Sequence, residues 1–139
     1  MNHYLTTLNQ SLTEFYDKMS SWEQSVVKET GYSLAQTHTV EVLGNHGAMR
    51  MKELAEKLAI TTGTLTVQID KLVNAGLIER CPHPEDRRAI VVALTEQGEA
   101  LHRQHNQLHL ELVAELTRNI QPAQLNVLID CLDKINQEF

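Results

Sequence analysis

Residues 51–98 read MKELAEKLAITTGTLTVQIDKLVNAGLIERCPHPEDRRAIVVALTEQG, and this stretch decides the fold of the chain. Apolar residues recur every three or four positions over 52–58 and again over 62–75, which predicts two short helices. Apolar residues that alternate over 77–80 and 89–94 predict two strands. The segment between the strands contains two prolines, which exclude a central strand there and indicate a protruding tip. The stretch therefore predicts two short helices followed by a hairpin.

The chain before this stretch predicts two further helices. From Leu5 to Val26 the apolar residues step by three and four, the pattern of one long amphipathic helix that ends near Gly31. Ser33 is the expected N-cap of a second helix, because its hydroxyl can accept a hydrogen bond from a free backbone N–H of the first turn. We expect a glycine break over 44–47 to end that helix.

The chain after this stretch also predicts two helices. A long helix with an apolar stripe is expected to begin near Glu96. Gln121 and Pro122 break it, because proline lacks the N–H that a helix interior needs. A last helix then carries apolar residues from Leu125 to Ile135.

The predicted fold class is mainly α with a small β-hairpin wing, and the length favours a single domain over 1–139. Residues 33–95 form the expected winged helix-turn-helix lobe. The long helices within 1–31 and 96–139 carry more apolar surface than this small lobe covers. We therefore expect them to act as dimerisation helices in a homodimer.

The composition is that of a folded protein, with 42% hydrophobic and 22% charged residues. No stretch approaches the roughly 18 apolar residues of a membrane span, and the polar start MNHYLTTLNQ lacks the pattern of a secretory signal. We therefore expect no membrane partner and a cytoplasmic location. Cys81 and Cys131 form no CxxC pair and are expected to be free thiols.

The net charge of −6 is unevenly spread along the chain. Seven basic and six acidic residues lie between Arg50 and Val92, whereas the remainder holds five basic and twelve acidic residues. The negative charge therefore lies on the flanks and spares the middle. The total charge neither proves nor forbids binding to nucleic acid.

The second short helix and the hairpin carry side chains that suit contact with DNA. A helix-turn-helix places its second helix in the major groove, and a narrow hairpin wing reaches phosphates or the minor groove. Helix caps and solvated loop charges explain each feature alone, but the combination favours DNA binding. The candidate DNA-binding residues are Thr61, Thr62, Thr64, Gln68, Lys71, Arg87 and Arg88.

Three segments resemble the core of the multiple antibiotic resistance regulator (MarR) family: KLVNAGLIER at 71–80, DRR at 86–88 and LTEQG at 94–98. The element order resembles that family over nearly the whole chain. The resemblance implies a transcriptional regulator, which we interpret as a repressor. It also implies that a homodimer binds a pseudo-palindromic double-stranded operator, with half-sites about one helical turn apart.

A metal site is a separate prediction. His105 and His109 are four residues apart on the long helix and therefore share one face, a spacing that leaves open a core pair, a surface pair or a metal site. His105 lies in the apolar stripe, and we expect His38 on the inward side of its helix. The pattern resembles the zinc-responsive subset of the MarR family, and this resemblance implies His38, His105, His109 and Glu23 as zinc ligands. Glu41 is the alternative carboxylate.

Other functions are weighed against zinc control. Release by a small phenolic ligand, which is common in the family that the chain resembles, stays open, as does oxidation of a thiol. Neither cysteine lies where peroxide-sensing relatives keep their reactive thiol. An enzyme is not expected, because the segment from His105 to His109 lacks the glutamate that acts as general base in an HExxH motif.

Overall fold

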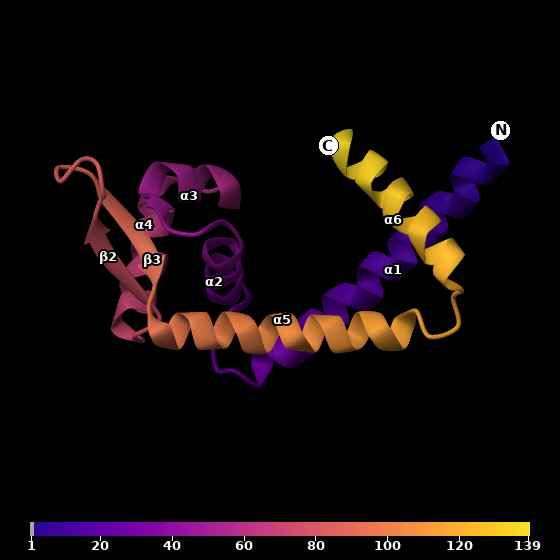
Figure 1. Ribbon diagram of the computed structural model, residues 1–139, viewed down its shortest axis with the longest axis horizontal. Helices are drawn as coiled ribbons and strands as arrows, with labels where there is room; N and C mark the ends of the chain where they lie inside the picture. Colours follow the sequence, from indigo (N-terminus) through magenta and orange to yellow (C-terminus); the bar gives the residue numbers. More distant parts are fainter. Residues whose placement is uncertain (1) are drawn as a thin grey trace. The chain divides into compact units, whose positions relative to one another are not determined.

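The computed structural model describes residues 2–139, which divide into two compact units, one that ends at Ala100 and one of residues 101–139. The described elements, labelled in Figure 1, are α1 (Asn2–Lys28), α2 (Leu34–His46), β1 (Met49–Arg50), α3 (Met51–Leu58), α4 (Thr62–Asn74), β2 (Ile78–Pro82), β3 (Ile90–Leu94), α5 (Glu96–Leu116) and α6 (Pro122–Gln137). The mainly α fold class with a small winged sheet is confirmed. The single domain over 1–139 stays a prediction.

The core of the first unit lies where α2, α3 and α4 pack against one another and against the sheet (Figure 1). Each helix contributes the apolar positions that its period places on one face. The largest fully buried side chains are Val40, Leu43, Leu54, Leu65, Ile69, Leu72, Leu77, Ile78 and Val92, with Thr39. This core fixes the two short helices and the hairpin as one rigid lobe.

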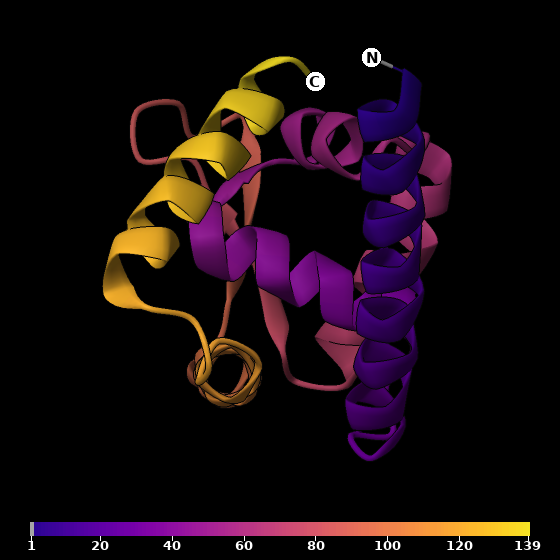
Figure 2. The ribbon, with the colours of Figure 1, turned by 90° about the vertical axis from the view of Figure 1, so that its right-hand side faces the viewer.

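The helix ends follow the capping signals of the sequence. Ser33 caps α2 as predicted: its hydroxyl accepts a hydrogen bond from the Gln36 backbone N–H, and the Gln36 side chain accepts one from the Ser33 N–H, each at 3.0 Å. The predicted break at 44–47 comes later than its first residue, because α2 continues through Gly44 to His46 and Gly47 is its C-cap. The helix keeps Leu43 buried at 1% exposure, and this packing outweighs the weak helix propensity of glycine. Figure 2 shows α1 as one unbroken helix.

The sheet has three antiparallel strands in the order β1-β3-β2, so the predicted hairpin gains a strand. Met49 of β1 lies opposite Val92 of β3, and Arg80 of β2 lies on the other side of the same valine. This central position corrects the prediction of simple alternation along β3. Val91 and Val92 are both buried, whereas Ile90 is exposed.

The second unit consists of most of α5, the turn at 117–121 and α6. Gln121 forms a capping box with Gln124, and Pro122 occupies the first helical turn, where a missing N–H costs nothing. The last helix therefore begins at Pro122 as predicted, but the long helix α5 already ends at Leu116, before Gln121 and Pro122. Among the described residues no helix is both long enough and apolar enough to cross a membrane.

Candidate functional site

Helix α4 is held from behind by the core and presents a polar outer face. Its inward residues Leu65, Ile69 and Leu72 are fully buried. Outside them, Thr62, Thr64 and Lys71 are exposed. The structure therefore leaves three of the predicted DNA-binding side chains accessible on one element.

Thr61 is the N-cap of α4, and its hydroxyl is used within the protein. Its Oγ1 accepts a hydrogen bond from the Thr64 backbone N–H at 3.1 Å and donates one to Thr64 Oγ1 at 3.0 Å. The Thr61 hydroxyl is thus committed to the N-cap, while Thr64 keeps its own hydroxyl proton for donation. Thr61 contributes to the site mainly by fixing the first turn of α4.

Replacing Thr61 with alanine is expected to lower the free energy of unfolding by about 1 kcal/mol, because the N-cap hydrogen bond is lost. Urea unfolding followed by circular dichroism measures this change. Thr62→Ala, one residue into the helix, is the matched control and is expected to stay within roughly 0.5 kcal/mol of the parent. Equal losses in both variants would contradict the capping role.

Gln68 lies closer to the protein core than the sequence indicates. It is half-buried, and its Oε1 lies 3.3 Å from the hydroxyl of Thr39, a fully buried residue of α2. This contact turns Gln68 toward α2. The neighbouring residue Val67 is exposed on the outer face of α4 instead, and the sequence did not point to it as a candidate.

An ion pair joins α4 to the wing. Arg80 Nη2 of β2 donates to Asp70 Oδ1 at 2.5 Å, and the two side chains are 36% and 57% exposed. A pair at this exposure contributes little to stability. Its effect is to neutralise Arg80 and Asp70, so that Lys71 carries the cationic charge on the outer face of α4.

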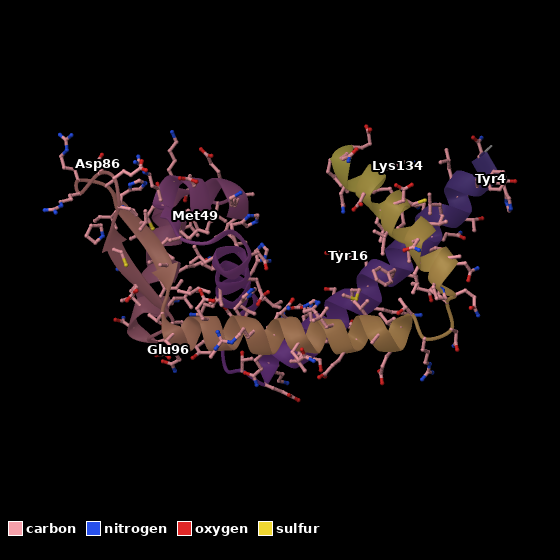
Figure 3. All side chains as sticks on the ribbon, viewed as in Figure 1. Tyr4, Tyr16, Met49, Asp86, Glu96 and Lys134 are labelled. Carbon is pink, nitrogen blue, oxygen red and sulfur yellow. The ribbon has the colours of Figure 1, made fainter. Side chains whose placement is uncertain are left out.

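The wing tip holds two exposed arginines, Arg87 and Arg88, as predicted. The tip is closed by a hydrogen bond from the His83 backbone N–H to the Ala89 carbonyl at 2.9 Å. Asp86 Oδ1 accepts the Arg88 backbone N–H at 3.1 Å and lies 3.7 Å from Arg88 Nε. Figure 3 shows Asp86 at the end of the hairpin, away from the start of α5 at Glu96. Asp86 therefore orients Arg88, and Arg87 is free to reach a phosphate or a groove.

The structure brings His105 and His109 together on α5. Their Nε2 atoms are 3.1 Å apart, and the ring centroids are 4.8 Å apart at an angle of 63°. His105 is buried at 3% exposure and His109 is half-buried. The burial of His105 agrees with its predicted place in the apolar stripe. The pair presents two imidazole nitrogens at one point.

The other predicted ligands belong to the first unit, and their role stays a prediction. Glu23 of α1 is half-buried beside Ser20 and Leu34, and Glu41 of α2 is half-buried as well. The inward placement predicted for His38 is wrong, since its side chain is exposed. Helix α2 buries Thr37, Val40 and Leu43, which turns position 38 away from the core of its own unit.

The two cysteines are free thiols, as predicted. Burial raises the pKa of the Cys81 thiol, and the neighbouring carboxylate of Glu79 raises it further. A raised pKa keeps the thiol protonated and unreactive near neutral pH. Cys81 is therefore a poor site for oxidation.

Helices α3 and α4 pack against each other, and α4 has an exposed outer face. With a hairpin that carries basic residues at its tip, they define a winged helix-turn-helix protein. Residues 32–90 match the sequence profile of the MarR family. Over this part of its length the chain is similar to proteins of the MarR family. The multiple antibiotic resistance protein MarR of Salmonella typhimurium is 37% identical over 90 residues, which is 64% of this chain and 62% of that protein.

Solved structures resemble the chain over most of its length. The reduced form of MarR from E. coli superposes with a TM-score of 0.71 at 27% identity, covering 92% of this chain and 95% of that one. FabT of Streptococcus pneumoniae, solved in complex with DNA, has a TM-score of 0.82 at 24% identity and covers 95% and 94%. The latter likeness shows the fold alone.

The sequence matches are shorter than the relatives themselves. They span 53% of YfiV from Bacillus subtilis, an uncharacterized HTH-type transcriptional regulator, and 62% of the Salmonella protein. The name of YfiV is that of a transcriptional regulator, which agrees with the expectation of a regulator rather than an enzyme.

Proposed function

We propose that this chain is a DNA-binding transcriptional regulator that represses by occupying an operator. The observation that carries the proposal is the pairing of the exposed face of α4 with the exposed Arg87 and Arg88 at the wing tip. A helix of this kind fits the major groove, and an arginine at a hairpin tip fits the minor groove or the phosphates. FabT, which shares the fold, was solved bound to DNA, and this supports the same use of the fold here.

The protein acts as a homodimer in this proposal. Helix α6 buries none of its residues, and five of its large apolar side chains are exposed. Large apolar residues near the start of α1 are exposed as well, and Figure 3 shows Tyr4 and Tyr16 along that helix. A single amphipathic helix with a bare apolar face is marginal in water, so a second copy is the natural cover. Two copies then read the two half-sites of a pseudo-palindrome.

Binding to DNA is tested with an operator selected from a random duplex pool by the full-length protein. We expect a complex of two chains per duplex, and we expect Arg87→Ala to weaken binding to selected and random duplexes alike. Loss of one phosphate contact per chain reduces the slope of log affinity against log salt concentration by about 1 for each half-site. Fluorescence anisotropy at several salt concentrations measures both effects.

The control for this test is Glu85→Ala, which removes an exposed acidic residue from the same wing. We expect it to bind DNA at least as tightly as the parent, because it removes a charge that repels phosphate. If no sequence is enriched and random duplexes bind only weakly, the proposal of a DNA-binding regulator is wrong.

Zinc controls the regulator in the finer form of the proposal. The pair on α5 supports this, because two nitrogens on one tetrahedral zinc ion, each at about 2.0–2.1 Å, lie about 3.3 Å apart. The observed 3.1 Å between His105 and His109 Nε2 fits two such ligands and equally fits a ring-to-ring hydrogen bond in the metal-free protein. The donor chemistry of two imidazoles with a carboxylate from Glu23 and a further imidazole from His38 is that of a closed regulatory zinc site.

In this proposal the four predicted residues serve as zinc ligands. His105 and His109 hold the ion from α5, and Glu23 and His38 complete the set. When bound, zinc supplies a fixed cationic centre that gathers ligands distant in sequence. Linkage then requires that zinc and operator DNA each tighten the binding of the other.

A further inference from the structure

The packing of the fold does not explain why position 67 is a valine. It lies on α4 and is 56% exposed, whereas the apolar residues Leu65, Ile69 and Leu72 of the same helix are fully buried. Among the described residues of α4 it is the one large hydrophobic side chain left exposed. A β-branched residue also disfavours a helix slightly, so position 67 gains no stability from being valine.

The position one turn earlier on the same face is Gly63, which the fold does not require either. A Cβ added to Gly63 meets only Thr61 Oγ1, at 3.9 Å, and its backbone is not in the left-handed region. Glycine in a helix is less stable than alanine by up to about 1 kcal/mol. The bare backbone at Gly63 therefore allows a close approach from outside the protein, beside Val67.

The polar groups around Val67 are already paired within the protein. Thr66 donates its hydroxyl to the Thr62 carbonyl at 2.8 Å, and Asp70 pairs with Arg80. Gln68 is turned toward Thr39. Directly beside Val67 the outer face therefore offers mainly its methyl groups, and the free donors, the Thr64 hydroxyl and Lys71, lie three residues before it and four residues after it.

We propose that Val67 recognises the C5 methyl group of a thymine in the major groove, with Gly63 allowing the base edge to approach. This inference rests on the proposed function, in which α4 enters that groove. Thymine alone among the four bases presents a methyl group there, and an apolar side chain reads it by contact without a hydrogen bond. A valine methyl against a thymine methyl removes apolar surface of both from water.

Deoxyuridine tests the proposal, because it pairs as thymine does and lacks only the methyl group. Each thymine of the selected operator is replaced singly by deoxyuridine, and the affinity of the full-length protein is measured by anisotropy. We expect one replacement in each half-site to weaken parent binding by about fourfold, the value of one buried methyl group. Val67→Ala is expected to bind the thymine duplex more weakly and to lose the preference for thymine over deoxyuridine at that position.

Two further variants make the result specific. Lys71→Ala should weaken binding to thymine and deoxyuridine duplexes by the same factor, because a phosphate contact does not read the base. Gly63→Ala should melt at the parent temperature or above it and bind the operator more weakly. Unchanged operator binding by Gly63→Ala would overturn the close approach on which the methyl contact depends.

The experiments distinguish a failure of the thymine proposal from a failure of the regulator proposal. If the parent selects an operator but no deoxyuridine replacement weakens binding, or if Val67→Ala keeps the full thymine preference, the reading of thymine by Val67 is overturned and the regulator proposal stands. If the parent selects no operator, both proposals fail.

Discussion

Replacing Gly98 with alanine is expected to lower the free energy of unfolding by about 3–5 kcal/mol, the sum of overpacking and lost hydrogen bonds. A Cβ at this position would lie 2.1 Å from the Leu77 carbonyl oxygen and 3.2 Å from Leu94 Cδ2. The melting temperature should fall by roughly 10–20 °C for a chain of this size. Thermal and urea unfolding followed by circular dichroism measure the change.

The Leu77 carbonyl cannot move aside to relieve this clash. It accepts the Thr95 backbone N–H at 3.0 Å, and the Leu77 side chain is buried at 1% exposure. Thr95 ties the same junction further, since its hydroxyl donates to the Gly76 carbonyl at 2.6 Å and accepts the Gly98 N–H at 3.1 Å. Displacing the start of α5 would break these bonds together.

Gly63→Ala is the matched control for Gly98→Ala, because both place a methyl group in the first turn of a helix. At Gly63 the added group has open space, so the variant should be as stable as the parent or more stable. A Gly98→Ala protein that melts within 2–3 °C of the parent, a shift worth no more than about 1 kcal/mol, would show that the junction yields and that this account of it is wrong.

Much of the fold was predictable because its signals are local. The apolar periods predicted α3 and α4 nearly to their ends, and Ser33 and Pro122 marked two helix starts. Strand β1 was missed because two residues, Met49 and Arg50, are too few to show alternation. Its existence depends on the pairing with β3, which is more than forty residues away in sequence.

The candidate site was predictable where exposure follows from position in a loop, and not where it depends on distant contacts. Arg87 and Arg88 lie at a proline-flanked tip, so their exposure follows from the turn. Gln68 meets Thr39 across 29 positions, and Asp70 meets Arg80 across a helix and a turn. Such contacts decide which α4 side chains stay free, and no local pattern reveals them.

Removal of zinc is expected to weaken operator binding by about 10- to 100-fold, within the usual range of coupling between two sites. The protein is purified without added zinc, and its metal content is measured by mass spectrometry before anisotropy titrations with and without a chelator. His109→Gln should lower the bound zinc and abolish the effect of the chelator, because the half-buried amide keeps polarity but removes one imidazole of the pair. His109 is preferred to His105 for this test, since truncating the buried His105 would also disturb packing.

His102→Gln provides the matched control, because His102 is a half-buried histidine on the same helix and is outside the predicted ligand set. It should keep both the zinc content and the response to chelator.

Reciprocity adds a second readout: saturating operator should tighten zinc binding by the same factor by which zinc tightens operator binding. Operator affinity that is unchanged by chelator in a protein shown to bind DNA would rule out zinc control. A loss of binding on addition of phenolic compounds would then assign control to an organic ligand, with the 3.1 Å contact on α5 left as a hydrogen bond between two rings.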